Sequence, residues 1–193
     1  MKHIAIFASG SGTNAENIVR YFTKSETVNV EVVLSNNREA GVHARVNGLG
    51  IPSIVFSKED FAAGTPVVAK LAEYGVDLVV LAGFMSMISA PLLKAYPDRI
   101  VNIHPALLPA YGGKGMYGMH VHEAVVAAGE RETGITVHLV NERYDEGQIV
   151  FQAKCPVSPK DTAEEVARKV HALEYRHYPH VIEELLMRQN YIL

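Results

Sequence analysis

Short apolar runs alternate along the first half of the chain with segments whose apolar residues recur every three or four positions. Such runs, each followed by Gly, Ser or Asn, are typical of buried strands, and the three-to-four-residue repeat is typical of helices packed on a sheet. The pattern predicts strands at residues 4–8, 28–34, 53–56, 78–82 and 100–103. It predicts helices at residues 15–24, 39–49, 65–74 and 92–96.

The second half of the chain has a different pattern. Residues 105–118 hold four glycines and two prolines without a clear period, which predicts a long loop. A helix at residues 120–128 and two strands at 133–140 and 148–157 follow. A long helical pattern then covers residues 162–187, and we expect a break or kink at Pro179, which cannot donate a backbone hydrogen bond.

Alternating strands and helices indicate an α/β fold. We expect one Rossmann-like, doubly wound domain over residues 1–193, with a mostly parallel sheet, an antiparallel strand pair near the C-terminal part and a long C-terminal helix. Ligands of such sheets bind beyond the carboxyl ends of the strands. Polar clusters at four such ends should therefore form one site; they lie at residues 9–14, 83–87, 102–105 and 145–147.

Composition narrows the classes of function. The 193 residues are 48% hydrophobic and 20% charged, with a net charge of −3 and no basic run, which argues against a nucleic-acid partner. The apolar stretch at residues 78–93 contains Gly, Ser and Pro and is too short to span a bilayer, so we expect a soluble enzyme without a membrane partner. Cys155 is the single cysteine, which fits a reducing cytoplasm.

The glycine-rich loop Ser-Gly-Ser-Gly-Thr-Asn at residues 9–14 joins the first strand to the first helix. Backbone amides at a helix N-terminus bind anions, so a phosphate would fit here, with Thr13 or Asn14 capping the helix. The loop is neither a P-loop nor a complete dinucleotide fingerprint, because it lacks Gly-Lys-Ser/Thr and the third glycine. A plain turn explains the same residues, and both interpretations stay open.

Asn102 and His104 lie on one face of a strand end, with Ile103 on the other face. An amide and an imidazole side by side can hold a carbonyl oxygen as it becomes an oxyanion. Asp145, in the turn between the last two strands, would raise the pKa of a neighbouring His104 and accept a proton from an attacking amine. Taken singly, a structural histidine and a surface turn aspartate remain the alternatives.

Other chemistries find little support. His120 and His122 are two residues apart at a helix start and therefore face different directions. No His-Glu-x-x-His or Gly-x-Ser-x-Gly motif is present, so we expect neither a metal nor a serine nucleophile.

Five motifs together resemble the formyltransferases that use 10-formyltetrahydrofolate, in order and spacing over essentially the whole chain. They are the loop at 9–14, Val-Leu-Ala-Gly-Phe-Met at 80–85, Asn-Ile-His-Pro-Ala-Leu-Leu-Pro at 102–109, Gly-Ile-Thr-Val-His at 134–138 and Asp-Glu-Gly at 145–147. The resemblance implies formyl transfer from 10-formyltetrahydrofolate, without a metal, to the primary amine of glycinamide ribonucleotide in de novo purine (IMP) biosynthesis.

The resemblance also implies roles for individual residues. Asn102, His104 and Asp145 would be catalytic, and Thr136 and His138 would support them. The residues implied for the ribonucleotide are Gly12, Thr13, Asn14, His171 and Glu174. The residues implied for the folate are Met85, Ser86, Met87, Ile88, Ile100, Asn102, Val140, Asn141 and Asp145.

The chain departs from its relatives at Ser86, where an arginine is common, at His171, where some have glutamine, and in the longer, glycine-rich stretch at residues 111–118. The alternatives within the family are a formyltetrahydrofolate deformylase, which normally has an extra N-terminal domain, and a methionyl-tRNA formyltransferase, which has a further basic domain. A non-catalytic nucleotide- or folate-binding module is the alternative from another class. We expect a monomer or homodimer.

Overall fold

The computed structural model describes residues 1–188, which form two compact units. The first unit comprises residues 1–101 and, at the end of the described chain, residues 182–188; the second comprises residues 102–181. Hydrogen-bonded neighbours give the strand order β3-β2-β1-β4-β5-β6-β7. Strand β5 (Ile100–His104) belongs to both units, because the division falls between Val101 and Asn102.

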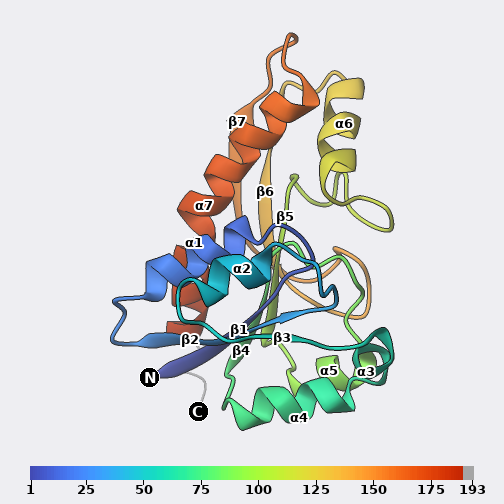
Figure 1. Cartoon of the computed structure of the whole chain (residues 1–193). Coiled ribbons are helices and arrows are strands. Elements are labelled where there is room, and N and C mark those ends of the chain that lie inside the picture. The colour runs from blue at the N-terminus through green and yellow to red at the C-terminus, as the bar shows by residue number, and fades with distance from the viewer. Residues whose placement is uncertain (189–193) are drawn as a thin grey trace. The chain divides into compact units, whose positions relative to one another are not determined.

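The first unit is built on four parallel strands with helices on both faces. The strands are β1 (Lys2–Phe7), β2 (Val28–Ser35), β3 (Ser53–Val55) and β4 (Leu78–Leu81). The helices are α1 (Thr13–Phe22), α2 (Val42–Asn47), α3 (Lys58–Ala63), α4 (Thr65–Glu73) and α5 (Ala90–Ala95). Helices α1 and α2 cover one face of the strands, and α3, α4 and α5 lie on the other (Figure 1). Strand β4 is buried throughout, as its unbroken apolar run predicts.

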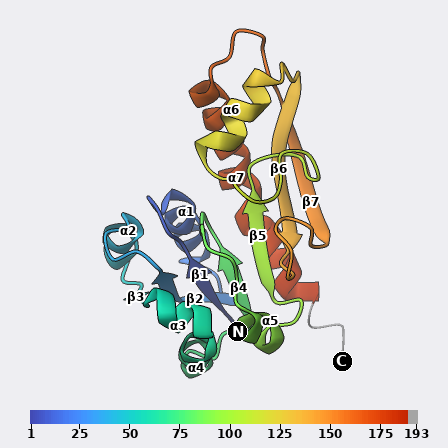
Figure 2. The same ribbon diagram turned by 90° about the vertical axis from the view of Figure 1, so that its right-hand side faces the viewer.

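The second unit pairs β6 (Glu132–Leu139) with β7 (Ile149–Pro156) in antiparallel register, Thr136 opposite Gln152. This unit also contains helix α6 (Met119–Ala127) and the part of helix α7 (Ala163–Arg188) up to residue 181 (Figure 2). The register shifts between Val137 and His138, which marks an irregularity near the end of β6.

The structure differs from the predicted helices at three points. Helix α7 continues without a break through Pro179, because Tyr178 and Ile182 on either side are fully buried and packing holds the helix through the missing hydrogen bond; a kink there stays a prediction. Helix α3, absent from the predicted elements, begins at a capping box in which Ser57 and Asp60 bond reciprocally. Gly12, rather than Thr13 or Asn14, is the N-cap of α1.

No helix within residues 1–188 is long and apolar enough to cross a membrane.

Candidate active site

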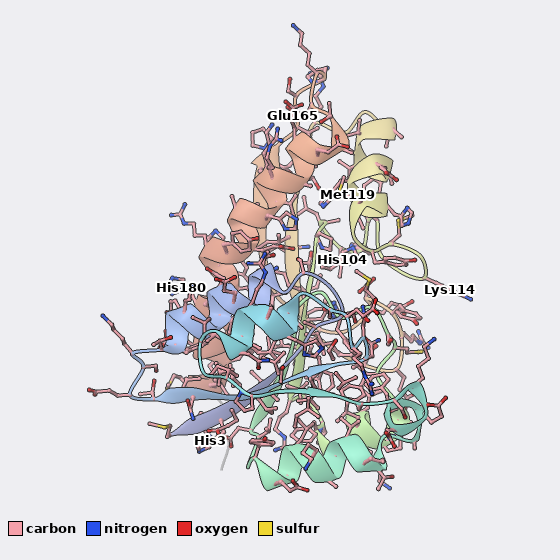
Figure 3. The ribbon with its side chains drawn as sticks, in the orientation of Figure 1. His3, His104, Lys114, Met119, Glu165 and His180 are labelled. Carbon is pink, nitrogen blue, oxygen red and sulfur yellow. The ribbon has the colours of Figure 1, made fainter. Side chains whose placement is uncertain are left out.

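The second unit brings together the C-terminal half of β5 and the turn between β6 and β7. Figure 3 shows His104 in the interior, whereas Lys114, on the 111–118 loop, projects outwards. The side chain of His104 is 4% exposed and that of Asp145 is 13% exposed. The Nδ1 atom of His104 lies 3.6 Å from Oδ2 of Asp145, so an imidazole and a carboxylate face each other in a largely water-free environment.

Two backbone groups of the 111–118 loop fix this pair. The Nε2–H of His104 donates to the carbonyl oxygen of Tyr111 at 2.7 Å, and the N–H of Gly113 donates to Oδ2 of Asp145 at 2.9 Å. Because a carbonyl oxygen only accepts, Nε2 must carry a proton. The Nδ1 atom is therefore the position at which His104 gains or loses its second proton, and it faces the carboxylate.

A second histidine lies between Asn102 and Asp145. The Nδ2 of Asn102 is 3.1 Å from Nε2 of His138, and the same Nε2 is 3.6 Å from Oδ1 of Asp145. The Nδ1 of His138 is 3.0 Å from the carbonyl oxygen of Leu139. Asn102, His104, His138 and Asp145 thus form one polar group on one face of the strand ends.

The environment sets the charge of each member. Burial lowers the pKa of His104 below its ordinary value, while Asp145 and the Tyr111 carbonyl oppose that shift. Burial alone would raise the pKa of Asp145, but the adjacent rings of His138 and His104 and the Gly113 N–H together bring it below its usual range. Asp145 is therefore ionised at neutral pH, and His104 is a weaker base than a histidine in water.

The segment that follows His104 is held by a buried hydroxyl. Thr136 is 0% exposed; its Oγ1 donates to the carbonyl oxygen of Ala106 at 2.7 Å and accepts the N–H of Leu108 at 2.9 Å. The side-chain amide of Gln152 donates to the same Oγ1 at 2.9 Å and to the carbonyl oxygen of Leu108 at 3.0 Å. The strand pair thereby anchors the chain just after β5, which fixes where His104 points.

In the first unit, the glycine-rich loop is fastened by its own carbonyl oxygens. Gly10 O accepts from the N–H of Val42 at 3.2 Å, and Ser11 O accepts from Nε of Arg45 at 2.9 Å. In a trans peptide the following N–H points the opposite way, so the N–H groups of Ser11 and Gly12 face away from these donors. No side chain caps α1. These N–H groups lie at the N-terminus of α1, where the helix dipole favours negative charge.

Gly12 cannot be replaced without a shift of the backbone. Its φ is +78°, a left-handed value that glycine takes without strain. A Cβ at this position would lie 2.5 Å from Cα of Val42. The close approach of this loop to α2 therefore requires glycine.

The segment after β4 contacts the same loop. The N–H of Met85 donates to Oγ of Ser9 at 3.0 Å, and the N–H of Ser9 donates to the carbonyl oxygen of Gly83 at 3.0 Å. Ser86 accepts a hydrogen bond of 2.6 Å from Nδ2 of Asn36. Met85 and Met87 are 56% and 48% exposed. These two flexible, apolar side chains are therefore accessible from solvent.

A histidine and a glutamate on α7 form the remaining predicted pair. The Nδ1 of His171 is 2.8 Å from Oε2 of Glu174, and this hydrogen bond raises the pKa of His171 above its ordinary value. Glu174 is buried, while the His171 side chain is about half exposed. Burial lowers the pKa of the neighbouring His122, whose ring packs edge-on against His171.

Among the described residues, no group of three or more His, Cys, Asp and Glu side chains is arranged to hold a metal ion.

Comparison with known proteins identifies the group to which these features belong. A model of the formyl transferase family matches residues 2–182. The chain belongs to the formyl transferase family. The chain is 43% identical over 94% of its length to the chloroplastic phosphoribosylglycinamide formyltransferase of Arabidopsis thaliana. It is 36% identical over 98% of its length to the phosphoribosylglycinamide formyltransferase of Bacillus subtilis, of which it covers 97%.

The chain spans 64% of the Arabidopsis protein and 61% of a similar protein from Vigna unguiculata, less than two thirds of each. Among solved structures, it superimposes on glycinamide ribonucleotide transformylase 1 of Geobacillus kaustophilus with a TM-score of 0.88 and 36% identity. That alignment covers 96% of this chain and 99% of the other. The strand and helix pattern of the sequence thus predicted the fold class correctly: this member of the formyl transferase family has a mixed α/β fold.

The four predicted clusters meet in two pairs. Residues 9–14 contact the segment after β4 in the first unit. In the second unit, His104 lies beside Asp145, and Asn102 is linked to Asp145 through His138. His120 and His122 point in different directions, as their spacing predicts, with only His122 buried.

The other predicted ligand contacts differ in exposure. Thr13 and Asn14 begin helix α1 and are half-buried. Ile88 and Ile100 belong to the core, so any effect they have on a ligand acts through packing. Val140 and Asn141 lie in the β6–β7 turn, which Asn141 closes by donating to the carbonyl oxygen of Glu146 at 3.3 Å.

Sequence reasoning missed the backbone groups of Tyr111 and Gly113 and the amide of Gln152. The first two lie in a loop without a periodic pattern, so nothing in the residue types indicates where its carbonyl and amide groups point. Gln152 could have been identified from the sequence, because pairing the two predicted strands places it opposite Thr136.

Proposed function

We propose that this chain transfers the formyl group of 10-formyltetrahydrofolate to the primary amine of glycinamide ribonucleotide, in de novo purine biosynthesis. The observation that carries the proposal is the buried imidazole–carboxylate pair of His104 and Asp145 beside the amide of Asn102. Family membership and the names of the B. subtilis and G. kaustophilus proteins support the choice of donor and acceptor.

The reaction needs an attack, an oxyanion and a proton transfer. The acceptor amine attacks the formyl carbon, and the carbonyl oxygen takes up negative charge. The amide of Asn102 donates to this oxyanion, and His104 adds positive charge beside it when its Nδ1 is also protonated. Asp145, held ionised, accepts the proton that the attacking nitrogen loses, directly or through water. As the oxyanion collapses back to a carbonyl, the bond from carbon to N10 breaks, and the proton taken up by Asp145 passes to N10 of the leaving tetrahydrofolate, directly or through water.

We assign the acceptor's phosphate to the amides of Gly12, Thr13 and Asn14, at the uncapped N-terminus of α1. Glu174 would accept hydrogen bonds from the ribose hydroxyls. His171 would donate a hydrogen bond to the phosphate. The raised pKa of His171 keeps a larger fraction of this ring positively charged near neutral pH, which favours an anionic ligand. Binding energy from these groups, remote from the amine, would serve to orient it for attack.

For the folate, the exposed methionines Met85 and Met87 supply apolar surface, and the hydroxyl of Ser86 supplies a neutral polar group where relatives have an arginine. Val140, Asn141 and Asp145 would contribute from the β6–β7 turn. Without an arginine at position 86, affinity for the folate should depend less on salt concentration than in relatives that have one.

We place the reaction in the cytoplasm, carried out by a monomer or a homodimer. The single cysteine of the protein, Cys155, is a free thiol whose pKa is raised by burial. It takes no part in the proposed chemistry.

The direct test is to mix the protein with 10-formyltetrahydrofolate and glycinamide ribonucleotide. Tetrahydrofolate and formylated ribonucleotide should form in equal amounts. Release of formate from the folate in the absence of ribonucleotide, at a similar rate, would contradict transfer and indicate hydrolysis instead.

A further inference from the structure

His138 is a buried histidine with an interaction at each ring nitrogen, and the chemistry proposed above gives it no step. It lies near the end of β6 and is 2% exposed. Its Nδ1 contacts the carbonyl oxygen of Leu139 at 3.0 Å, and its Nε2 contacts Nδ2 of Asn102 at 3.1 Å.

These two contacts determine where the proton of His138 lies. A carbonyl oxygen has no proton to donate, so Nδ1 of His138 carries one. In the neutral ring, Nε2 is then an acceptor, and the group beside it must donate. The amide nitrogen of Asn102 does so, which excludes the flipped amide with its oxygen towards the ring. The carboxylate oxygen of Asp145, at 3.6 Å, is beyond hydrogen-bonding distance of the same Nε2.

The backbone holds the Leu139 carbonyl in place. The N–H of Leu139 donates to the carbonyl oxygen of Gln148 at 2.9 Å. Gly147 lies so close that a Cβ on it would be 1.6 Å from the carbonyl oxygen of Leu139 and 3.4 Å from Nδ1 of His138. Glycine at 147 therefore leaves the space in which this carbonyl accepts from the ring.

We propose that His138 is a positioning residue, fixed as the neutral Nδ1–H tautomer, that sets the orientation of the Asn102 amide. One N–H of Asn102 is used on His138, and the other remains to donate to the oxyanion. His138 itself touches no reacting atom and acts through Asn102. The effect of His138 on catalysis rests on the proposed formyl transfer. The assignment of the Nδ1–H tautomer to His138 does not depend on that function.

The tautomer is measured on the wild-type protein without any substrate. Long-range ¹H–¹⁵N spectra of protein labelled with ¹⁵N-histidine, recorded at pH 7.5, should show His138 with a protonated Nδ1 and an unprotonated Nε2. Assignment uses the His138→Gln variant, which loses that one set of signals. An Nε2–H tautomer or a doubly protonated ring would overturn the proposal, whether or not the protein transfers formyl groups.

Two variants of His138 distinguish the role of its Nε2 from that of its Nδ1. In His138→Gln, the side-chain oxygen can reach the place of Nε2 and accept from Asn102. In His138→Asn, the shorter amide can replace Nδ1 towards Leu139 but offers nothing to Asn102. We expect kcat to fall about 100-fold in His138→Asn, as for a misplaced catalytic group, and KM to change little for either substrate. His138→Gln should retain most of the activity.

The same substitution in an Asn102→Ala background tests whether His138 acts through Asn102. With the amide gone, His138→Asn should lower kcat no further. Equal activity of the Gln and Asn variants, at equal melting temperature, would overturn the positioning role, as would a further 100-fold loss in the Asn102→Ala background.

Discussion

The imidazole of His104 donates its Nε2–H to the carbonyl oxygen of Tyr111 at 2.7 Å. Tyr111 has a φ of +56°, an uncommon value for a non-glycine residue, which turns its backbone into the position where the histidine needs an acceptor. The same hydrogen bond commits one ring nitrogen and leaves Nδ1 facing Asp145. The pair is thereby ordered before any substrate binds, which is the condition for electrostatic stabilisation of a transition state.

Removal of either member of the pair should affect the transition state more than substrate binding. In His104→Ala and in Asp145→Asn we expect kcat to fall by about 10²–10⁴, the range for general acid–base groups, with KM for both substrates within a few-fold. Steady-state kinetics with each substrate varied in turn measures this. A variant with wild-type kcat would remove that residue from the proposed mechanism.

The pKa of His104 should fall when its carboxylate partner is neutralised. Burial already lowers this pKa, and Asp145 is the strongest influence that raises it. In Asp145→Asn that opposing influence is lost, so the ring should titrate at a lower pH than in the wild type. The Cε1–H chemical shift of His104, followed by NMR from pH 4 to 8, reports it. A higher pKa in the variant would show that the carboxylate does not act on the ring.

The stability of the fold should decrease as the pH falls below about 6.5, the ordinary histidine pKa. Burial lowers the pKa of both His122 and His104. At pH values between the lowered pKa of the folded protein and the ordinary pKa, the unfolded chain binds more protons than the folded one. The free energy of unfolding therefore decreases as the pH decreases. Urea melts between pH 5 and 8 measure this slope.

His122→Gln should make that slope shallower, and His120→Gln serves as the matched control. His120 lies two residues earlier on α6, with its side chain 63% exposed. Equal slopes in the two variants would contradict a role for buried His122 in acid sensitivity.

Gly12→Ala should damage the glycine-rich loop, and Gly50→Ala is its control. Both glycines have a φ of +78°, but the added Cβ would lie 2.5 Å from Val42 Cα at position 12 and in open space at position 50. Gly50→Ala should cost about 1–2 kcal/mol, the penalty for the left-handed conformation alone. Gly12→Ala should cost more and raise KM for the ribonucleotide. An unchanged KM would show that the loop is only a turn.

Thr136→Val should destabilise the protein, whereas Thr133→Val on the same strand should not. Both threonines are buried, but Thr136 Oγ1 has three hydrogen-bond partners, whereas Thr133 Oγ1 has none among residues 1–188. Loss of the Thr136 hydroxyl leaves its buried partners without a hydrogen bond, which should lower the free energy of unfolding by about 1–3 kcal/mol. Loss of the Thr133 hydroxyl removes a buried polar group that has no hydrogen bond to lose. Thermal melts give the difference, and kcat should fall only in Thr136→Val. Equal melting temperatures would contradict the role of Thr136.

The strands and most helices followed from the apolar pattern, because each buries one face against neighbours in a predictable period. Ser57 illustrates what the pattern misses: helix α3 has a single fully inward residue, Phe61, and its start depends on a cap rather than on periodicity. Asn102 and His104 could be singled out because they lie near the end of β5, and Asp145 because it lies in the turn between β6 and β7. The groups that orient them could not be, since the direction of the Tyr111 carbonyl depends on a backbone angle.

Asp145 adopts a φ of +55°. Aspartate and asparagine visit this left-handed region more readily than other side chains, but glycine is the residue that fits it best. Selection for thermal stability alone would therefore favour glycine at position 145 and would delete the carboxylate. The turn between β6 and β7 is therefore a point at which stability and the proposed activity conflict, and engineering for heat resistance should leave Asp145 unchanged.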